Sequence, residues 1–230
     1  MATIERYVQP PRLYRYRPLK EFDREIEAIE EGYLFCADFK SLNDPMEGLY
    51  SSSQNLRESN DYRAVRQSIR DNKSDIGMCS FSEVRNHELM WAHYADQFKG
   101  ICISYSLSKL LKALPNEITF VRMFYNETEP TVYRTHRDHS QVAKMIFSYK
   151  NYRWLYEREW RMFAPLGKAN YHNTECVNRV YLGSRIKDSH RNEISRRLKQ
   201  LRIKISQMKI DKYSISFEAR SKSATESSFR

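Results

Sequence analysis

Glycine is scarce in this chain, with 6 among 230 residues, and the glycine-rich loops that bind nucleotide phosphates are missing. The sequence contains no GxxxxGK[ST] loop and no GxGxxG turn. It also lacks the HExxH motif of zinc peptidases and the GxSxG elbow of serine hydrolases. These absences argue against a P-loop enzyme, a Rossmann dehydrogenase, a zinc peptidase and an α/β-hydrolase.

Cysteine is also sparse, and the four residues Cys36, Cys79, Cys102 and Cys176 form no CxxC pair. Such spacing predicts neither a disulfide framework nor a structural metal site, and we expect mostly buried thiols. No signal peptide and no apolar run of about 18 residues is present. We therefore expect a reduced cytoplasmic protein without a membrane partner and without a bound metal.

Positive charge and aromatic side chains are what the chain has in excess. Lys and Arg number 39 against 29 Asp and Glu, and there are 16 Tyr, 11 Phe and 3 Trp. A net charge of +10 favours a polyanionic partner such as RNA or DNA, bound through a basic surface that includes residues 185–204. The aromatic residues fit either a tyrosine-rich core or stacking on bases or nicotinamide.

Hydrophobic spacing predicts an α+β protein. The predicted strands cover residues 13–16, 33–37, 76–82, 100–105, 118–125, 177–182, 203–210 and 213–217. The predicted helices cover residues 19–31, 61–71, 88–95, 107–114, 139–152 and 188–201, with Asn86 as an N-cap and a mobile loop at 48–60. Without a strict βαβ rhythm, we expect one domain at 1–218 with a mixed, mainly antiparallel sheet and flanking helices, followed by a disordered tail at 219–230.

Residues 154–161 hold the strongest candidate for a site. They place Glu157 and Glu159 two positions apart among aromatic and basic side chains. An extended segment over 157–164 would direct both carboxylates to one face, and Arg158, Trp160 and Met162 to the other. The segment fits a solvated strand face with ion pairs, or a carboxylate that holds a ribose hydroxyl or stabilises an oxocarbenium ion.

Three further clusters carry polar groups next to aromatic ones. Arg15 is either an exposed arginine between packed tyrosines or a guanidinium that binds a phosphate. Residues 42–47 fit a turn formed by Asn43 and Asp44 before Pro45, or a polar loop over a cleft. In the third cluster, Trp91 and Tyr94 share a helix face while His93 points elsewhere. A hydrolase built on Cys79, His93 and Asp96 has no support from spacing.

Together these clusters resemble an uncharacterised bacterial family, domain of unknown function 2971. The motifs that carry the resemblance are LYRY at 13–16, LNDPME at 42–47, CSFSE at 79–83, MWAHYAD at 90–96, GICI at 100–103 and YEREWR at 156–161. The resemblance implies one domain in a bacterial or phage setting, and it implies no activity.

A looser resemblance is to ADP-ribosyltransferases, which carry an arginine or histidine, then a serine or tyrosine, then a glutamate on successive strands. Arg15, Ser80 or Ser82, and Glu159 with Glu157 follow that order. The resemblance implies that Arg15 binds NAD, that the serine orders the site, and that Glu159 holds the nicotinamide-ribose 2′-hydroxyl with Glu157 as its helper. The residues expected to bind the cofactor are Arg15, Tyr16, Asn43, Asp44, Ser82, Trp91, Tyr94 and Arg161.

These observations predict an enzyme that cleaves NAD, its co-substrate, and transfers ADP-ribose to a protein or nucleic acid, as a toxin or phage-defence effector would. If so, Arg15, Ser80 and Glu159 should line one cleft. Two alternatives stay open: a non-enzymatic nucleic-acid-binding module, and a nuclease in which His93 is catalytic with Glu83 or Glu159.

Overall fold

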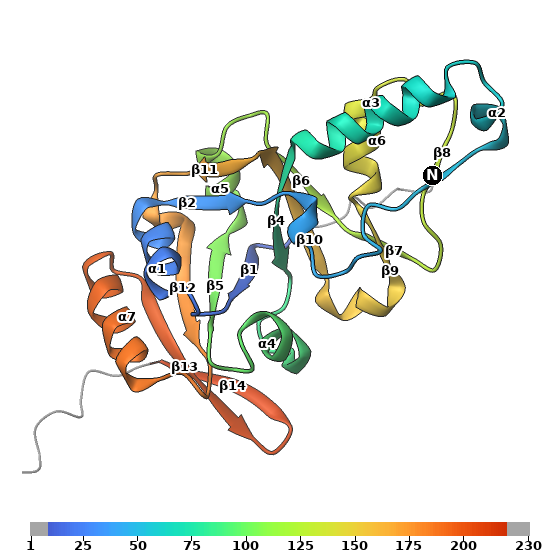
Figure 1. Ribbon diagram of the computed structural model, residues 1–230. Helices are drawn as coiled ribbons and strands as arrows, with labels where there is room; N and C mark the ends of the chain where they lie inside the picture. The colour runs from blue at the N-terminus through green and yellow to red at the C-terminus, as the bar shows by residue number, and fades with distance from the viewer. Residues whose placement is uncertain (1–8, 220–230) are drawn as a thin grey trace, which may run out of the picture.

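A mixed sheet forms the centre of the computed structural model, which describes residues 9–219 (Figure 1). Its strand order is β14-β13-β12-β5-β1-β4-β10-β6. The strands are β1 (Arg12–Arg17), β4 (Ile76–Ser82), β5 (Ile101–Ser106), β6 (Thr119–Arg122), β10 (Glu159–Pro165), β12 (Val177–Leu182), β13 (Lys204–Asp211) and β14 (Ser214–Ala219). Neighbours are antiparallel except β12 and β13, which α7 (Asp188–Gln200) connects. The predicted single α+β domain with a mainly antiparallel sheet is confirmed.

Helices cover both faces of this sheet. On one face, α1 (Phe22–Glu31), α5 (Leu107–Ala113) and α7 pack on the largest apolar core, into which Ile26, Leu110 and Ile194 project. On the other face, α4 (Glu88–Tyr94) buries Trp91 completely against Tyr16 and neighbouring aromatic rings. Strand alternation thus gives β1 one tyrosine-bearing face toward α4 and one face toward α1.

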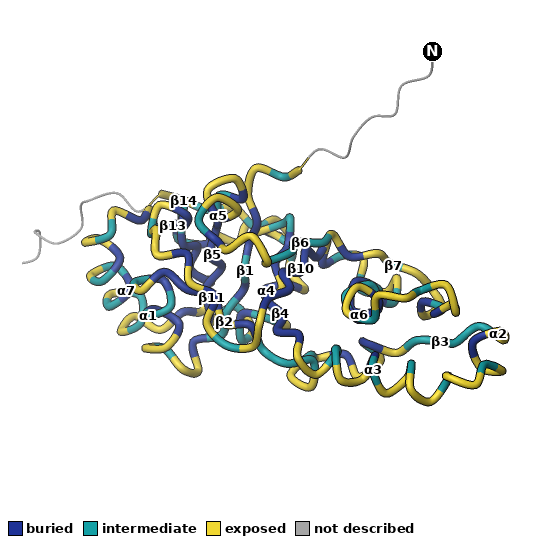
Figure 2. The backbone as a smooth tube through the Cα atoms, turned by 90° about the horizontal axis from the view of Figure 1, so that it is seen from above, coloured by how far each residue is buried: buried dark blue, intermediate teal, exposed yellow. Residues whose placement is uncertain are grey.

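The helices α3 (Tyr62–Asp75) and α6 (His139–Ile146) lie side by side at the end of the molecule away from α7 (Figures 1 and 2). A separate small core joins them to the preceding α2 (Gln54–Arg57), with Leu56, Ile69 and Ile146 buried. The short parallel strands β3 (Ser51–Ser52) and β8 (Thr131–Val132) connect this end to the rest of the chain.

Two further strand pairs flank the central sheet. They are β2 (Tyr33–Cys36) with β11 (Gly167–Asn170), and β7 (Phe124–Asn126) with β9 (Tyr149–Asn151). The 3-10 turns are η1 (Phe39–Ser41), η2 (Tyr152–Glu157) and η3 (Thr174–Cys176). All four cysteines are buried as free thiols, as expected. Within residues 9–219 no helix has the length and apolar character needed to cross a membrane.

Several element boundaries differ from the predictions. The expected helix at 139–152 ends at Ile146, and residues 149–151 form β9 instead. The expected strand at 118–125 divides into β6 and β7, which pair with different strands. The expected loop at 48–60 contains β3 and α2, His87 rather than Asn86 precedes α4, and no side chain caps that helix. Apart from Ala219, which ends β14, the predicted tail lies outside the described residues.

The sheet opens between β1 and β4, and this opening positions the candidate site. Strand β1 pairs with β5 from Arg12 to Arg17, yet its pairing with β4 is limited to Tyr14 with Ser82. Beyond that pair, Met78 of β4 exchanges backbone hydrogen bonds with Ala37 at 2.8 and 3.0 Å. Because alternate residues of a strand direct their N–H and C=O groups to the same side, the peptide groups of Ser80 face the gap that β1 leaves.

Candidate active site

A cleft of about 600 Å³ fills the opening between β1 and β4. Its volume lies within the range of about 300–1,000 Å³ that is usual for ligand pockets. Arg15, Ser80 and Glu159 all line it, from three different strands. By strand alternation and register, Ser80 and Glu159 lie on the α4 side of the sheet and Arg15 on the α1 side. They share one cleft because the sheet is open there, not because they share a face.

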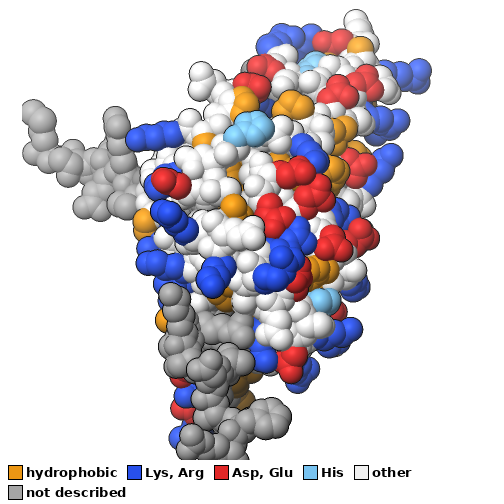
Figure 3. Space-filling model, turned by 90° about the vertical axis from the view of Figure 1, so that its left-hand side faces the viewer, with side chains coloured by type: hydrophobic (Ala, Val, Ile, Leu, Met, Phe, Trp, Pro, Cys, Tyr) orange, Lys and Arg blue, Asp and Glu red, His pale blue; other side chains and the backbone are white. Residues whose placement is uncertain are grey.

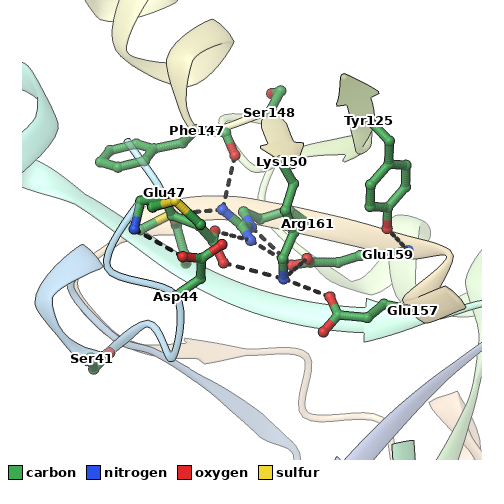
Figure 4. Close-up of polar contacts among 12 residues, drawn as sticks. Ser41, Asp44, Glu47, Tyr125, Phe147, Ser148, Lys150, Glu157, Glu159 and Arg161 are labelled. Atoms are coloured by element: carbon green, nitrogen blue, oxygen red, sulfur yellow. Dashed lines mark hydrogen bonds and ion pairs between the residues drawn. The ribbon is translucent and has the colours of Figure 1, made fainter. Parts of the chain in front are cut away.

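Five charged side chains that line the cleft form a buried cluster (Figure 4). The Lys150 ammonium lies 2.6 Å from Glu157, 3.1 Å from Glu159 and 3.2 Å from Glu47. The Arg161 guanidinium lies 2.7 Å from Glu159 and 2.6 Å from Glu47, and donates to the Phe147 carbonyl at 2.9 Å. Each of the five charged side chains is at most 5% exposed. Three carboxylates therefore meet two cations in a dry environment, with one negative charge in excess.

The pKa values of Glu157 and Glu159 are shifted in opposite directions in this cluster. Burial opposes the charge on Glu159, but Arg161 and Lys150 outweigh it and, with a hydrogen bond from Ser80, lower its pKa to about 2. Burial raises the pKa of Glu157, and repulsion from Glu159 adds to this against the attraction of Lys150. A carboxylate held ionised beside one that takes up a proton more readily is the arrangement that acid–base chemistry uses.

The geometry that brings Glu157 and Glu159 together differs from the predicted strand. Glu157 is the last residue of η2, and β10 starts at Glu159. Between them Arg158 takes a left-handed conformation, with φ 46° and ψ 50°. The carboxylates nevertheless meet at Lys150, while Arg158 and Trp160 both bind Glu83 on the other side. The expected division of side chains is present, but a turn produces it.

Glu47 reaches the cluster from the loop between η1 and β3. Asp44 begins the turn in this loop, since its carboxylate accepts from the Met46 N–H at 2.9 Å.

Farther along, Lys73 of α3 donates to the Gly48 carbonyl at 2.6 Å. The Lys73 ammonium also lies 5.3 Å from the ring centres of Phe39 and Phe147 and 5.8 Å from that of Tyr50. These contacts fix the loop whose Glu47 completes the charge cluster.

The substitution Gly48→Ala tests how tightly this loop is held. Gly48 has φ +79°, and an added Cβ would lie 2.8 Å from Cε1 of Phe147. We expect a loss of about 2–4 kcal/mol in the free energy of unfolding, because left-handed strain and the clash act together. The control is Gly167→Ala, where φ is +104° and nothing lies within 4 Å, so strain alone should cost about 1–2 kcal/mol. Urea denaturation measures both, and equal losses would show that the loop yields to the methyl group.

Arg15 makes no ion pair in the part of the chain that the structure describes, although the Glu25 carboxylate attracts it from a longer distance. Its guanidinium donates one long hydrogen bond, 3.4 Å to the Phe35 carbonyl. By contrast, the nearby Arg17 binds Glu25 through two nitrogen atoms. A half-buried guanidinium with unused donors in a cleft is suited to bind an anion from solution.

Most of the candidate residues lie at the cleft, and two do not. Those that line it are Arg15, Tyr16, Asn43, Ser80, Ser82, His93, Tyr94, Glu157, Glu159 and Arg161. Trp91 is fully buried and donates its indole N–H to the Arg85 carbonyl at 2.7 Å, so it anchors α4 to the sheet. Asp44 is buried at its turn and faces a smaller neighbouring pocket. Neither of these two side chains is placed to contact a ligand in the cleft.

Sequence reasoning missed Lys150 and Glu47, which hold the cluster together. Lys150 lies in a segment that was expected to be helical, where a lysine is ordinarily a solvated side chain. Glu47 stands in the motif at 42–47, but no local pattern shows that this loop reaches β10. The signal that could have found Lys150 is the pair of carboxylates at Glu157 and Glu159, which requires a cation close by once both are buried. No comparable signal points to Glu47.

The predicted basic surface is partly neutralised in the structure. On α7, Arg191 and Arg196 bind Asp188 and Glu193 of the same helix, and Arg197 binds Glu30 and Asp23. Acidic side chains lie among the basic ones on the face of the molecule that Figure 3 shows. A uniformly basic groove for a nucleic acid is therefore not formed on this face.

Comparison with known proteins gives one family match. The family model described as protein of unknown function (DUF2971) matches residues 90–162, roughly a third of the chain. No curated protein and no solved structure matches. The matched segment runs from Met90 of α4 to Met162 of β10 and includes Tyr94, Lys150, Glu157, Glu159 and Arg161. The resemblance of this chain to the DUF2971 family, expected from its motifs, is thus confirmed.

Proposed function

We propose that this protein cleaves the bond between nicotinamide and ribose in NAD and transfers ADP-ribose to an acceptor. The observation that carries the proposal is the cleft lined by Arg15, Ser80 and Glu159. These are the residues that the resemblance to ADP-ribosyltransferases implies, and three separate strands supply them.

The charges of the cleft suit the two ends of such a substrate. Arg15 has free donors for the pyrophosphate. At the other end, Glu159 is held ionised by Arg161 and Lys150 in a buried environment. Departure of nicotinamide leaves positive charge on the ribose, and a fixed negative charge stabilises that transition state more strongly in a dry site than in water.

The proposed reaction conserves charge without a redox step. The C1′–N bond breaks, its electron pair leaves with the nicotinamide ring nitrogen, and that nitrogen becomes neutral. The acceptor forms a bond to C1′ and releases one proton. Glu157, which also lines the cleft and has a raised pKa, is the group that takes this proton.

The nuclease alternative has less support from the positions of its residues. His93 is exposed at the cleft, which Glu159 also lines, but the other expected partner, Glu83, lies outside it and binds Arg158, Arg122 and Trp160. A nuclease would cleave nucleic acid without NAD and would lose that cleavage in His93→Ala. His93→Ala therefore distinguishes the nuclease from the NAD-cleaving enzyme. The proposed acceptor is a protein or a nucleic acid. Labelling with radioactive NAD would show which of the two receives the ADP-ribose.

The substitution Arg15→Ala tests the anion-binding end. We expect the KM for NAD in nicotinamide release to rise about 10- to 100-fold, because charge-assisted hydrogen bonds to the pyrophosphate are lost. The matched control is Arg12→Ala, an exposed arginine at the start of the same strand that does not line the cleft. An equal change in both variants, or no change in either, would refute the role of Arg15.

A further inference from the structure

Tyr94 ends α4 with its side chain directed at the buried charge cluster. Its phenol donates a short hydrogen bond to Oε1 of Glu157, and both residues line the cleft. The second carboxylate oxygen of Glu157 accepts from Lys150 at 2.6 Å. The Ser82 hydroxyl fixes the main chain at the same place by donating to the Glu157 carbonyl at 2.6 Å. Glu157 is therefore oriented from α4, β9 and β4 at once.

The position of Tyr94 results from the packing of α4. Trp91, one turn earlier, is fully buried against Tyr16 and Phe217, and this anchors the helix to the sheet. Tyr94 packs against the same core while its hydroxyl reaches Glu157. Since α4 joins this core through Trp91, the phenol is held in place by the fold and needs no ligand to order it.

Five titratable or charged groups face Glu157 from the surrounding elements. They are Tyr94 on α4, Lys150 on β9, Glu159 on β10, Tyr125 on β7 and Tyr156 on η2. Burial, and then the charge of Glu157, raise the pKa of Tyr94, so the phenol keeps its proton and remains a donor. A donor that cannot ionise favours the carboxylate form of its partner over the protonated form.

We propose that Tyr94 is a positioning residue, whose phenol orients Glu157 and favours the carboxylate that receives the proton of the acceptor. This inference rests on the proposed function and gives Tyr94, which was expected to bind the cofactor, a different role that acts through Glu157. The phenol keeps its own proton. The proton of the acceptor is transferred to Glu157, and the nicotinamide leaves with the electron pair of the broken bond.

The test is Tyr94→Phe, which removes the hydroxyl and retains the ring. Nicotinamide release from NAD, with water as the acceptor, is measured across pH for the purified full chain. We expect the acidic limb of kcat to move upward by about one pH unit, with activity about tenfold lower below that limb and recovered above it. The KM for NAD should stay unchanged. A purely structural role would lower activity at every pH.

Two controls make the outcome decisive. Tyr152→Phe changes an exposed tyrosine of η2 that neither faces Glu157 nor lines the cleft, and it should leave the profile in place. In a Glu157→Gln background, Tyr94→Phe should have no further effect. An unshifted profile in active Tyr94→Phe overturns the role of Tyr94 and leaves the proposed function standing.

A second measurement separates this failure from failure of the proposed function. Titration of the Glu157 carboxyl carbon by NMR does not depend on turnover, and Tyr94→Phe should raise its pKa. If the pKa rises but the wild-type protein releases no nicotinamide, the proposed function fails and the positioning role in this reaction fails with it. If the pKa does not rise, the hydrogen bond has no effect on Glu157 and the inference is wrong.

Discussion

Replacing Glu159 with glutamine is expected to lower the rate of nicotinamide release about 100- to 1,000-fold. Glutamine preserves the shape of the side chain and removes the charge that Arg161 and Lys150 hold in place. The transition state then loses the negative group opposite its developing positive charge. The protein should still fold, because Glu47 remains as a partner for both cations. Measurement of kcat at saturating NAD, together with thermal unfolding, separates the two effects.

Glu83→Gln is the matched control for this substitution. The Glu83 side chain is also nearly buried, at 6% exposure, and it binds Arg122 and Arg158 next to the same strand. It does not line the cleft, so its loss should change stability without a comparable change in kcat. Similar losses of kcat in both variants would mean that Glu159 matters through the fold alone.

Replacing Lys150 with methionine should have the largest effect on stability, a loss of about 3–5 kcal/mol in the free energy of unfolding. Lys150 is the only cation that touches all three buried glutamates among the described ion pairs. Methionine fills a similar volume but leaves Glu157 without a cationic partner and Glu47 and Glu159 with Arg161 alone. Urea denaturation with an unchanged m-value would measure this loss.

The double variant Lys150→Met with Glu157→Gln separates charge from packing. If uncompensated carboxylate causes the loss, the double variant should be about 1–2 kcal/mol more stable than Lys150→Met alone. Lys209→Met is the comparison for an exposed pair: Lys209 and Glu218 are both more than half exposed, and less than about 1 kcal/mol should be lost. A loss at Lys150 no larger than that at Lys209 would contradict a buried, ionised cluster.

The sequence predicts the strands that form the walls of the cleft better than it predicts the cleft itself. The bounds of β4 and β12 match the predicted residues, because each is a segment of strand length that is rich in apolar, β-branched and aromatic side chains. The helix α1 ends at Glu31, as predicted, because Gly32 takes a left-handed conformation with φ 72° after it. These features depend on neighbouring residues, and so local patterns are enough.

The site depends on contacts between distant segments, which local patterns do not specify. Nothing near Tyr14 in the sequence shows that β1 leaves β4 after one residue pair. The helical spacing of apolar residues continues past Ile146 toward Lys150, so the sequence predicts helix there. In the structure, Lys150 instead lies in β9, which pairs with β7. Glu47 joins Arg161 through a loop whose course depends on Lys73 and its aromatic neighbours. Burial of charge could be expected from Glu157 and Glu159, whereas the identity of the compensating cation could not.

The proposed cleavage of NAD can be measured by incubating the pure protein with NAD and separating free nicotinamide by chromatography. We expect release of nicotinamide in excess of the protein present, and nearly complete loss of release in Glu159→Gln. Intact NAD after prolonged incubation with folded wild-type protein, with and without cell extract as a source of acceptors, would contradict the proposal.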